Sequence, residues 1–350
     1  MTRYYTRPCN FYYGTQSKTL VKKKKSIPLN QIKEISFDQI ELVTHHSKKK
    51  IFINEIKSLP KKVKSKILSD LKNIRSKKKN FSNLNFKKIP NILGVLNLTP
   101  DSFSDGGKFN SKHKGIKHAI NLFNNGANLI DVGGESTRPG SRPISEKKEW
   151  ARLNNILKIL TKKIPLSLDT RKSIIMERSI KLGVKLINDI SGLSYDSNTL
   201  GVLKKYKIPF VIQHSKGTPE NMQNKPNYKN ELLEIYDFFE DKIKLLRSYG
   251  IKHNNIILDP GIGFGKNLKH NMSLIKNISI FHSLGFPILV GNSRKRFIKE
   301  ISEKNDSKSR VGGTMASSIY LMMQGVQILR IHDVNELMQG IKVFKRIMNN

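Results

Sequence analysis

Polar and ionisable side chains recur in this sequence directly after short apolar runs. Each run ends in at least one group that can carry charge or form hydrogen bonds. Any one of them could simply cap a following helix, but polar groups after every run favour a shared site. In chain order these groups are Asn97, Thr99 and Asp101; Asp131 and Glu135; Asp169 and Thr170; Asn188 and Asp189; His214; Asp259; Ser293 to Arg296; and Arg330, His332 and Asp333.

Two kinds of chemistry are expected from these groups. Asp169, Asn188 and Asp259 supply carboxylates and an amide, which suit a flat heterocycle with several N–H donors. The cations that would suit an anion are Arg138, Lys295, Arg330 and His332. Because barrels often hold phosphate near their seventh and eighth strands, the residues predict a heterocyclic substrate that carries phosphate.

Other catalytic patterns are missing from the sequence. The glycines of the segment 261–265 lack the G-x-G-x-x-G spacing of a dinucleotide site, so we interpret them as a tight turn near a ligand. His214 and His332 stand singly, without the spacing of a zinc site. No Ser–His–acid motif is present.

The apolar runs have the length of buried strands, and longer amphipathic stretches alternate with them. Seven helical stretches separate the runs, and an eighth, 335–348, follows. Eight such units from residue 90 onward predict an α/β fold, a (β/α)8 TIM barrel; a doubly wound sheet is the alternative. The runs are ILGVLNL (92–98), LIDVGG (129–134), PLSLDT (165–170), KLINDIS (185–191), PFVIQH (209–214), IILDPG (256–261), PILVGN (287–292) and QILRIHD (327–333).

Charge divides the chain near residue 90. The 350 residues carry a net +37, and residues 1–89 alone, with 20 Lys and 3 Arg against 5 acids, carry +18. We therefore expect a basic N-terminal extension, 1–89, before a barrel domain, 90–350. Alternating residues over 35–56 predict a small β-hairpin, and 59–79 has loose helical spacing before a solvated basic linker. The alternative is that this extension is mostly disordered.

Composition restricts the partners and the compartment. Lys outnumbers Arg 50 to 14, which favours compositional bias over a phosphate-reading surface, so nucleic acid is not expected as a partner. The single cysteine, Cys9, excludes intramolecular disulfides and fits a reducing compartment. No run approaches the ~18 apolar residues of a membrane span, and we expect a cytoplasmic protein with no membrane partner.

The strand ends lie within motifs that resemble those of the dihydropteroate synthase family of pterin-binding enzymes. The resemblance covers residues 92–336, essentially the whole barrel. Its segments are ILGVLNLTPDSFSDGG (92–107), ANLIDVGGESTRPGS (127–141), SLDTRK (167–172), INDISG (187–192), LDPGIGFGK (258–266), GNSRKRF (291–297), RVGGTMA (310–316) and ILRIHDVNE (328–336).

The resemblance implies a transferase of folate biosynthesis and a sulfonamide target. Its reaction condenses 6-hydroxymethyl-7,8-dihydropterin diphosphate with 4-aminobenzoate, giving 7,8-dihydropteroate and diphosphate. The pterin would bind to Asp169, Asn188, Asp259 and Lys295, of which Asp169, Asp259 and Lys295 are the expected catalytic residues. The diphosphate would bind to Asn97, Thr137, Arg138, Arg330 and His332.

Further expectations follow from the same resemblance. Asn97 would bind Mg²⁺ through its side-chain oxygen, and the protein would form a homodimer. The loops 99–108 and 135–142 would close over the site. The residues expected to contact the aminobenzoate are Phe103, Asp105, Pro139, Phe264 and Arg296.

Three residues depart from the family pattern. Arg296 stands where the family commonly has Ser near the aminobenzoate carboxylate, and we expect its cation to attract that carboxylate. Gln213 and Ser215 flank His214 where the family often has Met, and one of these positions touches the pterin pocket in relatives.

Two other functions are compatible with parts of the sequence. A pterin-dependent methyltransferase-type barrel would share the fold and the pterin carboxylates, but would not need the loop motifs or the diphosphate cations. A nucleic-acid-binding role of residues 1–89 has only its blocks of Lys in support.

Overall fold

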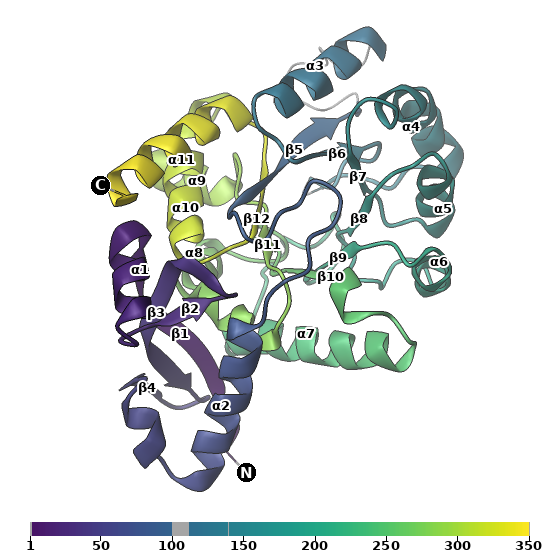
Figure 1. Ribbon diagram of the computed structural model, residues 1–350. Coiled ribbons are helices and arrows are strands. Elements are labelled where there is room, and N and C mark those ends of the chain that lie inside the picture. The colour runs from purple at the N-terminus through teal and green to yellow at the C-terminus, as the bar shows by residue number, and fades with distance from the viewer. Residues whose placement is uncertain (1, 100–111, 139, 350) are drawn as a thin grey trace.

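Eight parallel strands form the centre of the molecule (Figure 1). The computed structural model describes residues 2–99, 112–138 and 140–349. The strand order is β10-β9-β8-β7-β6-β5-β12-β11, and a bridge between Leu258 and Ile288 closes the circle. The predicted (β/α)8 barrel is thereby confirmed. The strands are β5 (Asn91–Asn97), β6 (Leu129–Gly133), β7 (Leu166–Asp169), β8 (Leu186–Asp189), β9 (Phe210–Gln213), β10 (Ile256–Asp259), β11 (Leu289–Val290) and β12 (Ile328–Ile331).

Helices surround the barrel and bury their apolar faces on it. In α7 the side chain of Asn230 caps the start by accepting from Leu233 N–H, and Glu231 follows in the first turn. The seventh connection holds two helices, α9 and α10, where the sequence predicted one stretch. The α-helices are α3 (Lys112–Asn124), α4 (Glu146–Leu160), α5 (Ser173–Lys181), α6 (Thr199–Tyr206), α7 (Glu231–Ser248), α8 (Leu268–Asn277), α9 (Arg296–Ser302), α10 (Val311–Met323) and α11 (Val334–Asn349); short 3-10 helices are η2 (His253–Asn255), η3 (Ile278–Leu284) and η4 (Lys308–Arg310).

The N-terminal extension is a folded α/β module at the side of the barrel (Figure 1). Its central strand β3 pairs antiparallel with β1, β2 and β4, so the structure places the β3–β4 hairpin inside a larger sheet. The helix α2 lies within the stretch 59–79 that has helical spacing. The elements are β1 (Tyr5–Tyr13), α1 (Gly14–Lys22), β2 (Ile27–Leu29), β3 (Ile32–Val43), β4 (Lys48–Phe52), η1 (Glu55–Ser58) and α2 (Lys61–Arg75).

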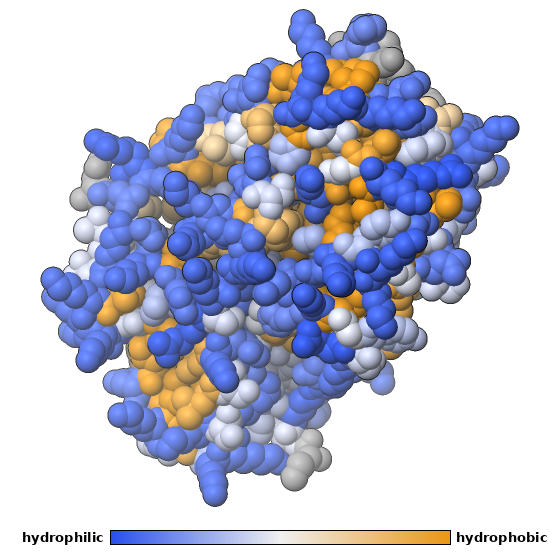
Figure 2. Space-filling model, turned by 45° about the vertical axis from the view of Figure 1, so that its right-hand side comes forward, coloured by the Kyte–Doolittle hydropathy of each residue, from blue (hydrophilic) through white to orange (hydrophobic). Residues whose placement is uncertain are grey.

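The module is fastened to the barrel at several separate points. Arg3 pairs with Glu240 of α7 at 2.8 Å, and Ser279 Oγ of η3 donates to Pro8 O at 2.9 Å. Asn73 Nδ2 donates to Ser283 O at 2.9 Å. Hydrophilic side chains cover much of the face in Figure 2, and apolar areas are visible between them at the lower left, over the module, and in the upper right part of the face. Among the described residues, no helix is long and apolar enough to cross a membrane.

The segment after α2 is only partly the solvated linker that its lysines predicted: Lys77, Lys79, Lys87 and Lys88 are exposed, but apolar residues between them are buried. Leu84 and Phe86 pack against strand residues at the N-terminal end of the barrel, including Leu93 and Leu129. Lys78 is buried too, where its Nζ donates to Gly285 O at 2.6 Å and burial lowers its pKa to about 7. The segment therefore plugs the end of the barrel opposite the strand ends that carry the polar groups.

Phe86→Ala should destabilise the protein by about 3–5 kcal/mol, because it leaves a cavity under the barrel. Phe86 is 2% exposed, whereas Phe52, in the same extension, is 47% exposed and serves as the matched control. Urea unfolding of the three proteins measures the difference. Equal losses of unfolding free energy in Phe86→Ala and Phe52→Ala would show that Phe86 does not fill the end of the barrel.

Candidate active site

Residues from four neighbouring strands lie in one row at the C-terminal end of the barrel, and three of them have polar side chains. Asn97 is opposite Gly133, Gly133 is opposite Asp169, and Asp169 is opposite Asn188. A Cβ on Gly133 would lie 3.4 Å from Asn97 Oδ1 and 3.6 Å from Asp169 Cβ, so the glycine leaves room for both neighbours. The register brings together residues that the sequence predicted for pterin and for diphosphate.

Arg330 joins the two predicted halves of the site. Its Nε donates to Asp131 Oδ2 at 2.6 Å, and its Nη2 donates to Asp169 Oδ2 at 2.8 Å. Asn188 Nδ2 donates to the same Asp131 oxygen at 3.0 Å. Burial alone would lower the pKa of Arg330, but Asp131 and Asp169 outweigh it and raise that pKa. The cation is therefore permanent, and it is held beside the heterocycle residues.

The two predicted pterin carboxylates are buried and poorly solvated. Burial raises the pKa of Asp169 above the usual range of a carboxyl group, although Arg330 opposes the shift. Burial raises the pKa of Asp259 to about 6, against a hydrogen bond from Gly261 N–H at 2.8 Å and the charge of Lys295. Hydrogen bonds from the N–H donors of a ligand would therefore stabilise both carboxylates in their charged form.

Lys295 lies directly before α9, with its ammonium 4.1 Å from the centre of the Phe264 ring. Burial lowers the pKa of Lys295 to about 8, and the positive charge of Arg330 acts in the same direction. The ammonium of Lys295 and the aromatic ring of Phe264 thus form one wall of the cavity.

His332 is placed as predicted but is not a cation. Burial, then the charges of Arg294, Arg330 and Lys295, hold the pKa of His332 well below its usual value. Its Nδ1 lies 3.0 Å from Ser293 Oγ. The prediction of a charged histidine was wrong, because the cations around it disfavour a further charge; a neutral imidazole offers hydrogen bonds instead.

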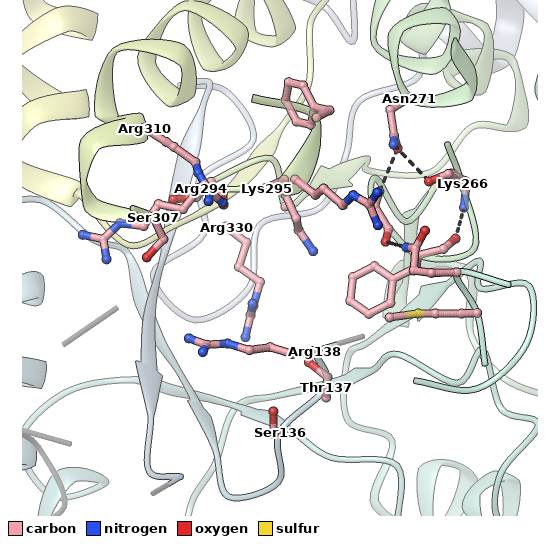
Figure 3. A pocket seen from close by; sticks show the side chains of 18 of the residues that line it. Ser136, Thr137, Arg138, Lys266, Asn271, Arg294, Lys295, Ser307, Arg310 and Arg330 are labelled. Atoms are coloured by element: carbon pink, nitrogen blue, oxygen red, sulfur yellow. Dashed lines mark hydrogen bonds between the residues drawn. The ribbon is translucent and has the colours of Figure 1, made fainter. Parts of the chain in front are cut away.

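A cavity of about 520 Å³ at the mouth of the barrel is lined by Asn97, Lys295, Arg330 and His332. Asp169, Asn188 and Asp259 line a separate cavity of only about 10 Å³, which shares Lys295 and Arg330 with the large one. Figure 3 shows Arg138, Lys295 and Arg330 pointing into the same space from different elements. Thr137 also lines the cavity, and Arg296 lies exposed at its rim. Three residues predicted for aminobenzoate fall outside the part of the chain that the structure describes: Phe103, Asp105 and Pro139.

Several buried charges near the site had no assigned role in the sequence analysis. Lys172 Nζ lies 2.8 Å from Glu135 and 2.6 Å from Glu149, and Arg171 Nε lies 2.9 Å from Glu135. Glu135 also accepts from Ile144 N–H at 2.8 Å, so it ties both ends of the loop that carries Thr137 and Arg138. In the sequence, Glu135, Arg171 and Lys172 follow strand ends closely, whereas Glu149 lies in α4, and only the fold shows that these residues pair.

Of the two residues flanking His214, only Gln213 contributes to the barrel interior. It is buried and lines the small cavity between Asp169, Asn188 and Asp259. Ser215 is half-buried, and its Oγ donates to Gly217 O. Within the described ranges, no three His, Cys, Asp or Glu residues are grouped as metal ligands.

The barrel and its site define a pterin-binding enzyme, since the model of the family described as "Pterin binding enzyme" matches residues 93–332. Dihydropteroate synthase from Synechocystis is 41% identical over 254 residues, 72% of this chain and 88% of that protein. The structure of Yersinia pestis dihydropteroate synthase with a sulfonamide drug has 38% identity and a TM-score of 0.73, covering 76% of this chain and 97% of the other. The Xanthomonas albilineans enzyme with 4-aminobenzoic acid has 32% identity and a TM-score of 0.69, covering 75% and 94%. The chain belongs to the dihydropteroate synthase family.

Proposed function

We propose that this chain catalyses the dihydropteroate synthase reaction, the condensation of 6-hydroxymethyl-7,8-dihydropterin diphosphate with 4-aminobenzoate. The observation that best supports this function is that Arg330 contacts Asp169 and also lines the cavity with Arg138 and Lys295. One connected site therefore offers acceptors for a heterocycle and cations for its diphosphate. The Synechocystis and Yersinia pestis relatives support this reaction by their names.

The residues suit a mechanism in which diphosphate leaves before the amine attacks. Arg330 and Arg138 would stabilise the negative charge that develops on the leaving oxygens. The buried Asp169 carboxylate would stabilise the positive charge that remains on the electron-rich dihydropterin. The aromatic amine then attacks the carbon from which the diphosphate has departed, and its nitrogen loses a proton. Phe264 and the stem of Lys295, whose ammonium lies 4.1 Å from the centre of the Phe264 ring, would hold the aminobenzoate ring.

We further propose that the reaction uses Mg²⁺ and that Asn97 is its protein ligand. Asn97 lines the cavity together with Arg138 and Arg330, the cations proposed for the diphosphate. A single amide oxygen fits Mg²⁺, which keeps several waters and commonly binds substrate phosphates. Bound there, the ion would supply charge stabilisation to the departing diphosphate.

The methyltransferase-type alternative lacks comparable support. A methyl transfer releases no diphosphate and gives no reason for Arg138 and Lys295 to face the cavity beside Arg330. The cytoplasmic location and the absence of a nucleic-acid partner stay predictions from the sequence.

Diphosphate release on adding 4-aminobenzoate to enzyme, pterin substrate and Mg²⁺ tests the reaction. Asp169→Asn should lower kcat about 100-fold or more, since one buried charge at the reacting ring is removed, while circular dichroism stays native. Chelation of Mg²⁺ should stop release, and added Mg²⁺ should restore it. Absence of release from the wild type would overturn the function, and wild-type turnover of Asp169→Asn would overturn that residue's role.

Arg296→Ser should raise KM for aminobenzoate about fivefold with little change in KM for the pterin substrate. Arg296 pairs with Glu300 at 2.7 Å, but its side chain is 68% exposed at the cavity rim, so its charge is partly screened. Lys299→Ser, on the exposed surface of the same helix, is the control. An unchanged KM for aminobenzoate in Arg296→Ser would remove Arg296 from the carboxylate site.

We also propose that the protein is a homodimer through the face formed by α10 and α11. That face has an apolar groove lined by Met315, Ile319, Val343 and Ile347, of which Val343 and Ile347 are 61% and 65% exposed. A two-fold axis through the groove would bury the same apolar face of both copies.

Val343→Glu should convert the dimer to a monomer, because it places a carboxylate in the apolar interface. Light scattering at micromolar concentration measures the mass. Leu245→Glu, at an exposed apolar position of α7, is the matched control and should leave the dimer intact. A wild-type monomer would refute the dimer, and a Val343→Glu dimer would refute this interface.

A further inference from the structure

Gln213 is the last residue of β9, and its side chain lies inside the barrel mouth. It is paired in register with Asp259, and only 3% of the residue is exposed. The cavity that it lines is also lined by residues of the proposed pterin site: Asp169, Asn188, Asp259, Lys295 and Arg330. Gln213 therefore faces the same enclosed space as the groups that would hold the heterocycle.

The amide nitrogen of Gln213 is buried without a hydrogen-bond partner among the described residues. A buried donor without a partner costs roughly 1–3 kcal/mol, so proteins seldom retain one unless a ligand or a water pairs with it. Two acceptors in the same cavity also lack described partners: Asp169 Oδ1 and Asn188 Oδ1. An unpaired donor and two unpaired acceptors thus belong to residues that line the same small cavity.

The backbone of Gly261 passes close to His214 and to the stem of Gln213. A Cβ on Gly261 would lie 2.0 Å from His214 O and 3.4 Å from Gln213 Cγ. Gly261 also has a φ of +69°, a conformation that favours glycine. Only glycine therefore fits beside His214 and Gln213 at this edge of the cavity.

The balance of donors and acceptors indicates what Gln213 recognises. The carboxylates of Asp169 and Asp259 and the oxygen of Asn188 accept, and they match the N–H groups of a heterocycle. A pterin also has acceptors, namely its carbonyl oxygen and its unprotonated ring nitrogens. Among the fully buried side-chain atoms that lack a described partner, Gln213 Nε2 is the donor in this cavity that can face those acceptors.

We propose that Gln213 is a specificity-determining residue that donates a hydrogen bond from Nε2 to an acceptor atom of the dihydropterin ring. This inference rests on the proposed function, because it takes the dihydropterin as the heterocycle. Gln213 acts on binding of the pterin, and it takes no part in binding of the aminobenzoate.

Gln213→Met tests the proposal, because Met has a similar unbranched shape and no donor. We expect KM for the dihydropterin diphosphate to rise about five- to tenfold, the value of one neutral hydrogen bond, with KM for aminobenzoate unchanged. The melting temperature without ligand should stay equal or rise, since a buried unpaired donor is lost. Gln213→Glu, which adds a third carboxylate to the cavity, should weaken pterin binding more than Gln213→Met.

Ser215→Met is the matched control on the other side of His214 and should leave both KM values unchanged. A purely structural Gln213 would instead give a lower melting temperature and no selective loss of pterin affinity, and that result would overturn the proposal. An unchanged KM for the pterin substrate in Gln213→Met would do the same.

Calorimetric titration with 6-hydroxymethylpterin separates this inference from the reaction itself. Weaker binding to Gln213→Met than to the wild type supports the role of Gln213 even if the wild type releases no diphosphate, a result that would refute only the proposed reaction. Equal binding to both proteins, with an active wild type, refutes the role of Gln213 alone.

Discussion

The contact of Arg330 with Asp131 and Asp169 is the interaction on which the site depends. It spans three strands of the barrel and places a permanent cation between the acceptors for a heterocycle and the cavity for its anion. Without the two carboxylates, a buried guanidinium would be costly to desolvate; without Arg330, the two carboxylates would repel each other. Asp131 also orients Asn188, so one carboxylate positions residues on both sides of the site.

This concentration of charge explains the individual properties of the neighbouring groups. Lys295 and His332 lie near Arg330, and their pKa values fall because burial and nearby positive charge act together. The ion pairs of Glu135 and Glu149 with Arg171 and Lys172 hold the base of the adjoining loop, and these two carboxylates and two cations add no net charge. The chain's net charge of +37 therefore bears little on its chemistry, which uses a few buried cations.

The opposite end of the barrel shows where local sequence patterns stop being informative. Lysines at 77–79 and 87–88 suggested a solvated linker, yet Leu84 and Phe86 between them fill the end of the barrel. Those two apolar residues have no helical or strand period, and their burial depends on strands that come later in the chain. The module before them binds to α7 and η3, contacts more than 200 residues away in the sequence.

The sequence by itself determined the eight strands, the residues at their ends and the family, because apolar periodicity and motif spacing are local properties of the chain. It also separated acceptors such as Asp169 and Asn188 from cations such as Arg138. Only the tertiary structure decided which of these groups touch and in what state. Barrel closure brings Arg330 to Asp169, 161 positions earlier, and burial among cations keeps His332 neutral. Likewise, Gln213 and Ser215 flank the same histidine in the sequence, and only the fold separates them: Gln213 ends β9 and lines the small cavity, whereas Ser215 lies in the loop beyond the strand.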